Sequence, residues 1–129
     1  MEIAYLNVDL ELQSKGSLKS ILKAFGNEVI VLYQGKKQGQ HFASLELVSM
    51  SKNVDWVVNK LCLLVERLSP QNRAIWNDCS SIVFDIGFES GLRPQGISWQ
   101  LKSKTLRRVS SIGGSIVITI YAVSDEEEQ

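Results

Sequence analysis

Residues 7–13, NVDLELQ, constrain the fold more than any other stretch of the chain, because apolar and polar side chains alternate there at every position. Successive side chains of a β-strand point to opposite faces of a sheet, so the alternation predicts a strand with one aliphatic and one polar face. The aliphatic face requires a core to cover it. The polar face carries Asp9 and Glu11 with no basic residue in the same strand.

Hydrophobic spacing divides the whole chain into strands and helices. The alternating strand extends over residues 4–12, and similar apolar stretches predict strands over residues 28–33, 41–49, 80–90 and 115–123. Spacing of three to four residues predicts helices over residues 17–26 and 53–68, a short helical turn from Pro70 to Trp76, and a last helix marked by Leu106, Val109 and Ile112. Glycines within residues 34–40 predict a hairpin turn between the second and third strands.

The order of the main elements is strand, helix, strand, strand, helix, strand, helix, strand. Its first six elements match the split βαβ arrangement of ferredoxin-like folds. We therefore predict an α+β fold: a mostly antiparallel sheet with helices on one face, made of a ferredoxin-like split βαβ core plus an extra helix and strand. Residues 1–123 are expected to form a single α+β domain, and residues 124–129, SDEEEQ, an acidic disordered tail.

Length and composition limit the class of protein. A chain of 129 residues can bury one core without disulfides, and 14 basic residues balance 14 acidic ones, which argues against nucleic-acid or membrane-surface binding. No apolar run approaches the roughly 20 residues that span a bilayer, and the first residues lack the pattern of a signal peptide. We therefore expect a cytoplasmic protein, in which Cys62 and Cys79 remain reduced thiols.

Patterns typical of catalysis are missing from the sequence. His41 is the only histidine, and the chain contains no G-x-S-x-G elbow, no H-E-x-x-H pair and no cysteine cluster. The stretch GKKQG joins two strands, so a hairpin turn is favoured over a phosphate loop. Arg107 and Arg108 are expected on a solvated helix face rather than at an anion site. The sequence therefore predicts no catalytic residue, no metal ligand and no cofactor.

The charges are distributed unevenly between the predicted elements. The cores of the predicted strands contain five acidic residues and no basic one, whereas all 14 Lys and Arg residues fall in helices, turns and loops. By alternation the acids point away from the core: Asp9, Glu11, Glu46, Asp85 and Glu89. In a ferredoxin-like order the first strand lies between the third and fourth, so these acids become neighbours. Like charges on adjacent strands repel, which indicates either a solvated face that tolerates the repulsion or a face that binds a cation or a basic partner.

Three stretches resemble a known family: VDLELQSKGSLKSILKAFG near the start, ERLSPQNRAIW at the end of the long helix, and TLRRVSSIGGSIVITIY near the end. The pattern of these stretches is similar to an uncharacterised family of small bacterial α+β proteins, classed as a domain of unknown function. Some members of that family lie beside toxin genes and are regarded as immunity proteins. The resemblance implies no catalytic motif and transfers no functional residue.

Three hypotheses from different classes follow. The first, which we favour, is a non-enzymatic protein-binding module, most concretely a cytoplasmic immunity protein whose acidic sheet face masks a cationic toxin domain such as a nuclease. Its contacts would be the five strand acids, with Trp99 and Tyr121 as aromatic anchors. The second is an enzyme whose carboxylates hold Mg²⁺ or Ca²⁺. The third is a structural or oligomerising module, and the sequence leaves the oligomeric state open.

Overall fold

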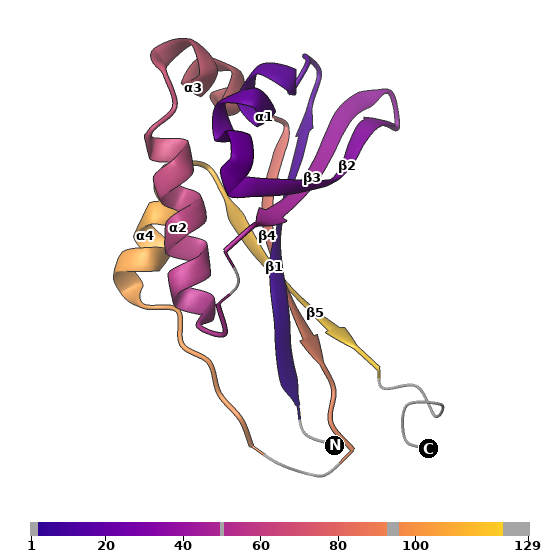
Figure 1. The fold of residues 1–129 in the computed structure, drawn as a ribbon, viewed down its shortest axis with the longest axis vertical. Coiled ribbons are helices and arrows are strands. Elements are labelled where there is room, and N and C mark those ends of the chain that lie inside the picture. The colour runs from indigo at the N-terminus through magenta and orange to yellow at the C-terminus, as the bar shows by residue number, and fades with distance from the viewer. Residues whose placement is uncertain (1–2, 50, 93–95, 123–129) are drawn as a thin grey trace.

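A single twisted sheet carries the helices on one of its faces (Figure 1). The structure, a computed structural model, describes residues 3–49, 51–92 and 96–122. The strands are β1 (Ala4–Ser14), β2 (Val29–Lys37), β3 (Gln40–Leu47), β4 (Ser81–Glu89) and β5 (Ser115–Tyr121). The helices are α1 (Lys19–Phe25), the 3₁₀ turn η1 (Gly26–Glu28), α2 (Val54–Glu66), α3 (Pro70–Asn77) and α4 (Ser103–Ser111). The predicted α+β fold is confirmed. The predicted acidic tail lies outside the described residues, among which no helix is both long and apolar enough to cross a membrane.

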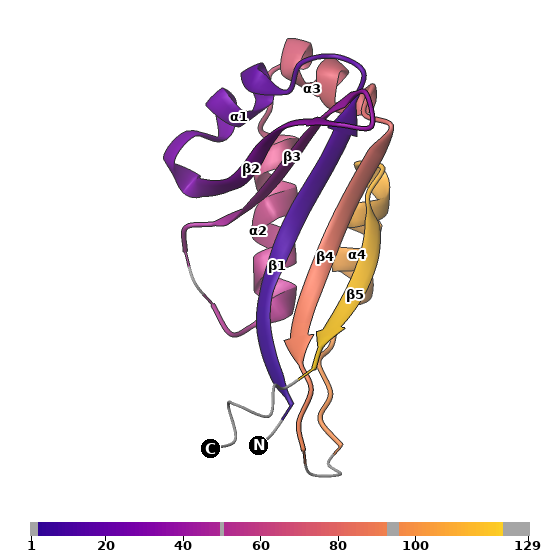
Figure 2. The ribbon, with the colours of Figure 1, turned by 90° about the vertical axis from the view of Figure 1, so that its right-hand side faces the viewer.

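The strand order is β2-β3-β1-β4-β5, and the pairs β2–β3, β3–β1 and β1–β4 are antiparallel. This is the order of the ferredoxin-like unit that the sequence predicted. Through α4 the chain then adds β5, which runs parallel to β4 at the edge of the sheet (Figure 2). β1 therefore lies between β3 and β4, and its polar face is at the centre of the sheet.

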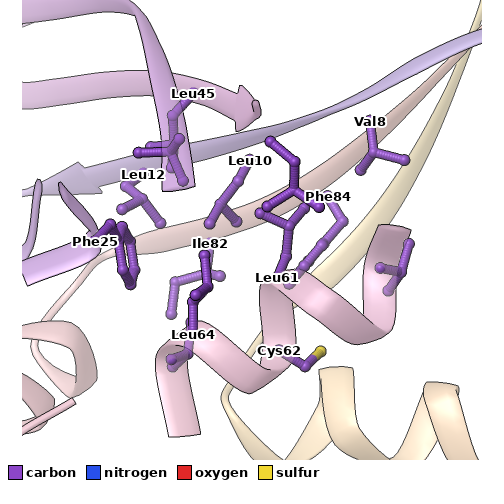
Figure 3. Close-up of a cluster of buried hydrophobic side chains, with 14 of the residues drawn as sticks. Val8, Leu10, Leu12, Phe25, Leu45, Leu61, Cys62, Leu64, Ile82 and Phe84 are labelled. Carbon is purple, nitrogen blue, oxygen red and sulfur yellow. The ribbon is translucent and has the colours of Figure 1, made fainter. Parts of the chain in front are cut away.

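Alternate residues of the central strands and one face of α2 form the hydrophobic core. Figure 3 shows Leu10 and Phe84 of the sheet close to Leu61 of α2. The buried side chains of β1 and β4 include the even-numbered Val8, Leu10, Leu12, Ile82, Phe84 and Ile86. Cys62 is buried in the core and Cys79 is partly buried, and both are free thiols, as predicted. The odd-numbered side chains at the centre of β1 and β4 consequently lie on the opposite face, which we call the open face.

The β2–β3 hairpin is tighter than predicted. β2 continues to Lys37, so the turn consists of Gln38 and Gly39 rather than residues 34–40. Both turn residues have positive φ angles, of 54° and 78°, as a two-residue type I′ turn requires. Lys36 and Lys37 therefore belong to a strand, and the prediction that the strands carry no basic residue is wrong at these positions.

α4 packs on α2 through a network of polar side chains. Leu106, predicted on the apolar face of this helix, is 46% exposed, whereas the adjacent Thr105 is buried. Thr105 Oγ1 donates a hydrogen bond to Asp55 Oδ1 (2.6 Å) and accepts one from Asn59 Nδ2 (2.6 Å). Asp55 Oδ1 also accepts from the backbone N–H of Lys102 at the start of α4 (2.9 Å). The hydroxyl of Thr105 can be buried because α2 satisfies it.

Arg108 extends this network along α4. Its Nε and Nη2 atoms donate to the two carboxylate oxygens of Glu66, at 2.9 and 2.7 Å, and its Nη1 donates to Asn59 Oδ1 at 2.9 Å. Two parallel bonds of this kind fix the geometry of a guanidinium and a carboxylate. The expectation of a simply solvated helix face is therefore wrong for Arg108, which joins α4 to α2.

Gly114, between α4 and β5, provides a test of how tightly this part of the molecule is packed. A Cβ at this position would lie 2.8 Å from Phe84 Cε1 and 3.0 Å from Val109 Cγ1. Gly114→Ala is therefore expected to lower the free energy of unfolding by about 1–3 kcal/mol, measured by urea denaturation. Gly16→Ala is the control, because a Cβ at Gly16 meets nothing within 4 Å. Equal stability of the two variants would contradict the described packing.

Candidate functional site

Four of the five predicted acids come together at the centre of the open face. Asp9 of β1 lies opposite Asp85 of β4 in the antiparallel register. Glu46 of β3 lies on the other side of Asp9, one residue beyond the last pair of the β1–β3 register. Glu11 is the next residue of β1 on this face. We refer to Asp9, Glu11, Glu46 and Asp85 as the acidic cluster.

The acidic cluster is electrostatically unfavourable in the isolated protein. Burial, followed by the charges of Glu46, Glu11 and Asp85, raises the pKa of Asp9 from 3.8 to about 6. Burial and the charge of Asp85 also raise the pKa of Glu11. Burial and then the charges of Asp9 and Glu46 raise the pKa of Tyr5 to about 12. All three shifts have the same direction because the folded protein disfavours negative charge in and beside the acidic cluster.

Neutral groups supply the side-chain hydrogen bonds that the acidic cluster makes within the described residues. Thr119 Oγ1 of β5 donates to Asp85 Oδ1 (2.7 Å), and Asn7 Nδ2 donates to Glu46 Oε2 (3.3 Å). Asp9 Oδ1 is buried and has no hydrogen-bond partner in the described part of the chain. A buried oxygen of this kind lowers stability, because water no longer solvates it.

The ion pairs of the described residues lie elsewhere. They join Lys60 to Glu28 at 3.7 Å and Arg108 to Glu66 at 2.7 Å. Within the described ranges, no Lys or Arg therefore comes within ion-pair distance of the acidic cluster. A sheet surface usually offsets such a concentration of charge by mixing the two signs on neighbouring strands.

Lys37 is the cation of the open face that the sequence analysis missed. Its charge lowers the pKa of Glu11, although burial and Asp85 outweigh this effect. Its Nζ lies 4.8 Å from the centroid of the Phe42 ring, at the end of the face where the hairpin turns. The signal that could have revealed it is a two-residue turn, which would have extended the second strand to Lys37.

Exposed apolar side chains border the acidic cluster on both outer strands. On β2, Ile30 lies opposite Glu46 and is 46% exposed. On β5, Val117 lies beside Asp85 and is 42% exposed. A charged centre with an apolar border on each side is therefore built across the five strands.

Tyr121, one of the two predicted aromatic anchors, lies on this open face. Its ring is placed over Gly87, because a Cβ on Gly87 would lie 3.4 Å from Tyr121 Cε2 and 2.9 Å from Asn7 Oδ1. The glycine thus leaves room for the ring to lie close to the sheet. Tyr121 is still half exposed and can contact a partner.

The structure places the other two predicted contacts away from the cluster. Trp99 packs against Phe88, with ring centroids 4.7 Å apart, and both side chains are partly buried against the hydrophobic core. Trp99 therefore belongs to the helix-covered side of the sheet, and we leave it out of the candidate site. Glu89 pairs with Ala4 at the far end of β4, four residues beyond Asp85. It borders the face without joining the acidic cluster.

A cavity of about 130 Å³ opens beside the acidic cluster, between the first half of β1 and the end of β3. Its lining residues include Glu46, Tyr5, and the apolar Ile30 and Val48. The cavity therefore combines an acidic wall with an aliphatic one. This combination suits a side chain with an apolar stem and a cationic head.

The described residues give the metal-binding hypothesis no ligand set. No group of three or more His, Cys, Asp or Glu side chains in the described ranges is placed to hold a metal ion. Asp9, Glu46 and Asp85 lie in a row across three strands rather than around one point. We therefore do not pursue a carboxylate metal site.

The raised pKa of Asp9 predicts that the stability of the folded protein depends on pH. Because this pKa is 3.8 in the unfolded chain and about 6 in the folded protein, stability is lost as the pH rises through about 6. Asp9→Asn removes this dependence, so the variant is expected to melt about 2–5 °C above the wild type at pH 8, and the gap should close near pH 4. Thermal melts between pH 4 and pH 8 measure the difference.

The same melts on Asp78→Asn, an exposed acid at the end of α3, separate the effect of the cluster from that of net charge. A difference between wild type and Asp9→Asn that does not change with pH would contradict the assignment of the strain to Asp9.

The open face thus brings together uncompensated carboxylates, a neighbouring cavity and exposed apolar side chains. Such a surface can attract and hold a positively charged group. Comparisons of the chain with protein-family models, with curated proteins and with solved structures find no significant match.

Proposed function

We propose that the open face binds a basic protein partner and that the acidic cluster lies at the centre of the contact. The observation that carries the proposal is the row of Glu46, Asp9 and Asp85 across three adjacent strands, without an ion pair in the described part of the chain. Burial and charge repulsion, which together raise the pKa of Asp9, cost stability in the free protein. A cationic partner removes that cost, because an opposite charge nearby favours the ionised carboxylate.

The surroundings of the cluster suit a protein better than a small ion. A protein partner can bring complementary charge together with apolar contact, so aromatic and aliphatic side chains beside the charges favour a protein over a small ion. Ile30, Val117 and Tyr121 supply such side chains on the two outer strands. In the cavity, a Lys or Arg of the partner would lay its stem along Ile30 and place its charge against Glu46.

In its most specific form, the proposal is that the chain is a cytoplasmic immunity protein that masks a cationic toxin domain. A nuclease fits this description, because nucleic-acid-binding surfaces use Lys and Arg to contact phosphates. An acidic face would compete with the nucleic acid for the same basic residues. Complementary charge would also speed the encounter of the two proteins, which suits a protein that has to neutralise a harmful enzyme.

The experiment is affinity capture from the native cell with two matched variants. The open-face variant, Asp9→Asn with Glu46→Gln, removes two charges of the acidic cluster. The control variant, Glu28→Gln with Asp78→Asn, changes the net charge equally at exposed positions outside the cluster. We expect the wild type and the control variant to capture the same basic protein and the open-face variant to lose it.

The free open-face variant should melt at the same temperature as the wild type or higher, because the removed charges repel each other. Capture of the same protein by all three forms would refute the proposal. Unfolding of the open-face variant would refute it as well, since the acids would then be structural.

A further inference from the structure

The two outer strands of the sheet differ in how they are protected against pairing with another chain. Native edge strands usually carry a lysine, a proline or a β-bulge that blocks further pairing. β2 has two of these, namely a register shift between Val31 and Tyr33 and the lysines at its end. β5, with the sequence SIVITIY, has no charge and no proline, and its register with β4 is regular over all seven residues. Within the described residues, the edge of β5 therefore carries none of these protections.

β5 also exposes large aliphatic side chains on the side of the sheet that carries the helices. Ile116, at the start of the strand, packs against the core. Ile118 and Ile120 point to the same side but are 61% and 66% exposed. Figure 1 shows the reason, because β5 runs away from α4 towards its C-terminal end. Covering these two side chains would stabilise the protein by removing apolar area from water.

We propose that a second copy of this chain covers this edge, with the two β5 strands paired antiparallel around a two-fold axis perpendicular to the sheet. The two five-stranded sheets then form one continuous sheet with all helices on the same side. In an antiparallel pair, residues directly opposite each other point to the same face of the sheet. The two-fold axis therefore lies between the two copies of one residue. Only an axis at Ile118 pairs all seven residues from Ser115 to Tyr121.

The residues that meet in this register are complementary. Ile118 lies opposite the partner's Ile118, and Ile116 lies opposite the partner's Ile120, which makes one aliphatic row on the helix side. On the open face, Val117 lies opposite the partner's Thr119. A two-fold interface has to be self-complementary, and this strand meets the condition because it has no charge that would face its own copy.

Electrostatics also permits a second copy at β5. Asp85 is the acid of the cluster nearest this edge, and it lies on β4, one strand away. Asp85 and the partner's Asp85 would be separated by three strand spacings, about 14 Å at 4.8 Å each. That distance exceeds the screening length of about 8 Å at physiological salt. The edge of β5 carries no acid for a basic partner, so the occupant differs from the one proposed for the open face.

The test is sedimentation velocity of the purified protein from about 1 µM to about 1 mM, a range that covers the affinities of small interfaces. The wild type is expected to approach twice the mass of one chain as its concentration rises. In Ile118→Lys, the lysines of the two copies would lie opposite each other and repel, so this variant should stay a single chain at every concentration. Leu32→Lys, which puts the same charge at an exposed position of β2, is the control and should behave like the wild type.

Several results would overturn the proposal: a wild type that stays a single chain, an Ile118→Lys variant that still dimerises, or a loss of dimer in Leu32→Lys alone. If β5 instead pairs with a strand of another protein, the purified wild type should stay a single chain, and that result contradicts the proposal. If Ile118→Lys fails to fold, Ile118→Cys replaces it, because thiols at the two-fold axis would be opposite each other and should cross-link on oxidation. Leu32→Cys is the control that should not cross-link, and equal cross-linking of the two would overturn the register.

Discussion

Replacing Trp76 by alanine is expected to lower the free energy of unfolding by about 3–5 kcal/mol, a large part of the 5–15 kcal/mol that holds a typical domain together. The side chain is fully buried at the end of α3. Its ring meets the Phe25 ring of α1 edge to face, with centroids 6.5 Å apart, and its Nε1 donates to the carbonyl of Ile112 after α4 (2.8 Å). Alanine removes both contacts and leaves a cavity between three helices. Urea denaturation measures the loss.

Two further variants make this prediction specific. Trp56→Ala removes the same ring from a position on α2 that is 44% exposed, and it should cost less than about 1 kcal/mol. Trp76→Phe keeps an aromatic ring but leaves the Ile112 carbonyl without its donor, so an intermediate loss is expected. Similar losses for Trp56→Ala and Trp76→Ala would show that the two positions are not buried as described.

The second large effect is expected in the kinetics of partner binding. Once the captured partner is purified, the open-face variant should associate with it on the order of tenfold more slowly than the wild type at low ionic strength. The gap should narrow as salt is added, because the screening length falls from about 30 Å at 0.01 M to about 8 Å at 0.15 M. Stopped-flow mixing at several salt concentrations measures both quantities.

The control variant, with Glu28 and Asp78 neutralised, should retain most of the association rate and of its salt dependence. This comparison distinguishes a local effect of the acidic cluster from a general effect of net charge. Equal slowing in the two variants would show that the partner recognises the total charge of the protein and not the open face.

The centre of the candidate site could be predicted from the sequence because each step used a strong local rule. Alternation in residues 7–13 assigned Asp9 and Glu11 to one face of a strand. The order of elements then placed that strand between the third and the fourth, which brought Glu46 and Asp85 to its sides. Neither step needed knowledge of how individual side chains pack, and the structure confirms both.

Other features depended on contacts that the sequence does not display. Lys37 was assigned to a turn because Gly35 looked like part of a loop, but glycine is accommodated in β2 and Gln38 adopts the left-handed conformation instead. Trp99 precedes a helix in a segment without periodicity, so only the tertiary position of Phe88 shows which side of the sheet its ring occupies. The burial of Thr105 required a hydrogen-bond partner fifty residues away.

The contact between α2 and α4 gives the protein two acid responses of opposite sign. Burial raises the pKa of Asp55, but hydrogen bonds from the Thr105 hydroxyl and the Lys102 N–H outweigh it and leave this pKa below 3.8. Hydrogen bonding from Arg108 lowers the pKa of Glu66 below 4.5. Protonation of these two groups therefore weakens the contact between α2 and α4 only below their ordinary pKa values of 3.8 and 4.5. On the opposite side of the sheet, charge repulsion already decreases as the pH falls through about 6. We therefore expect the free energy of unfolding to rise on mild acidification and to fall again in stronger acid, when the contact between α2 and α4 weakens. The pH of maximum stability is expected on the acidic side of neutrality.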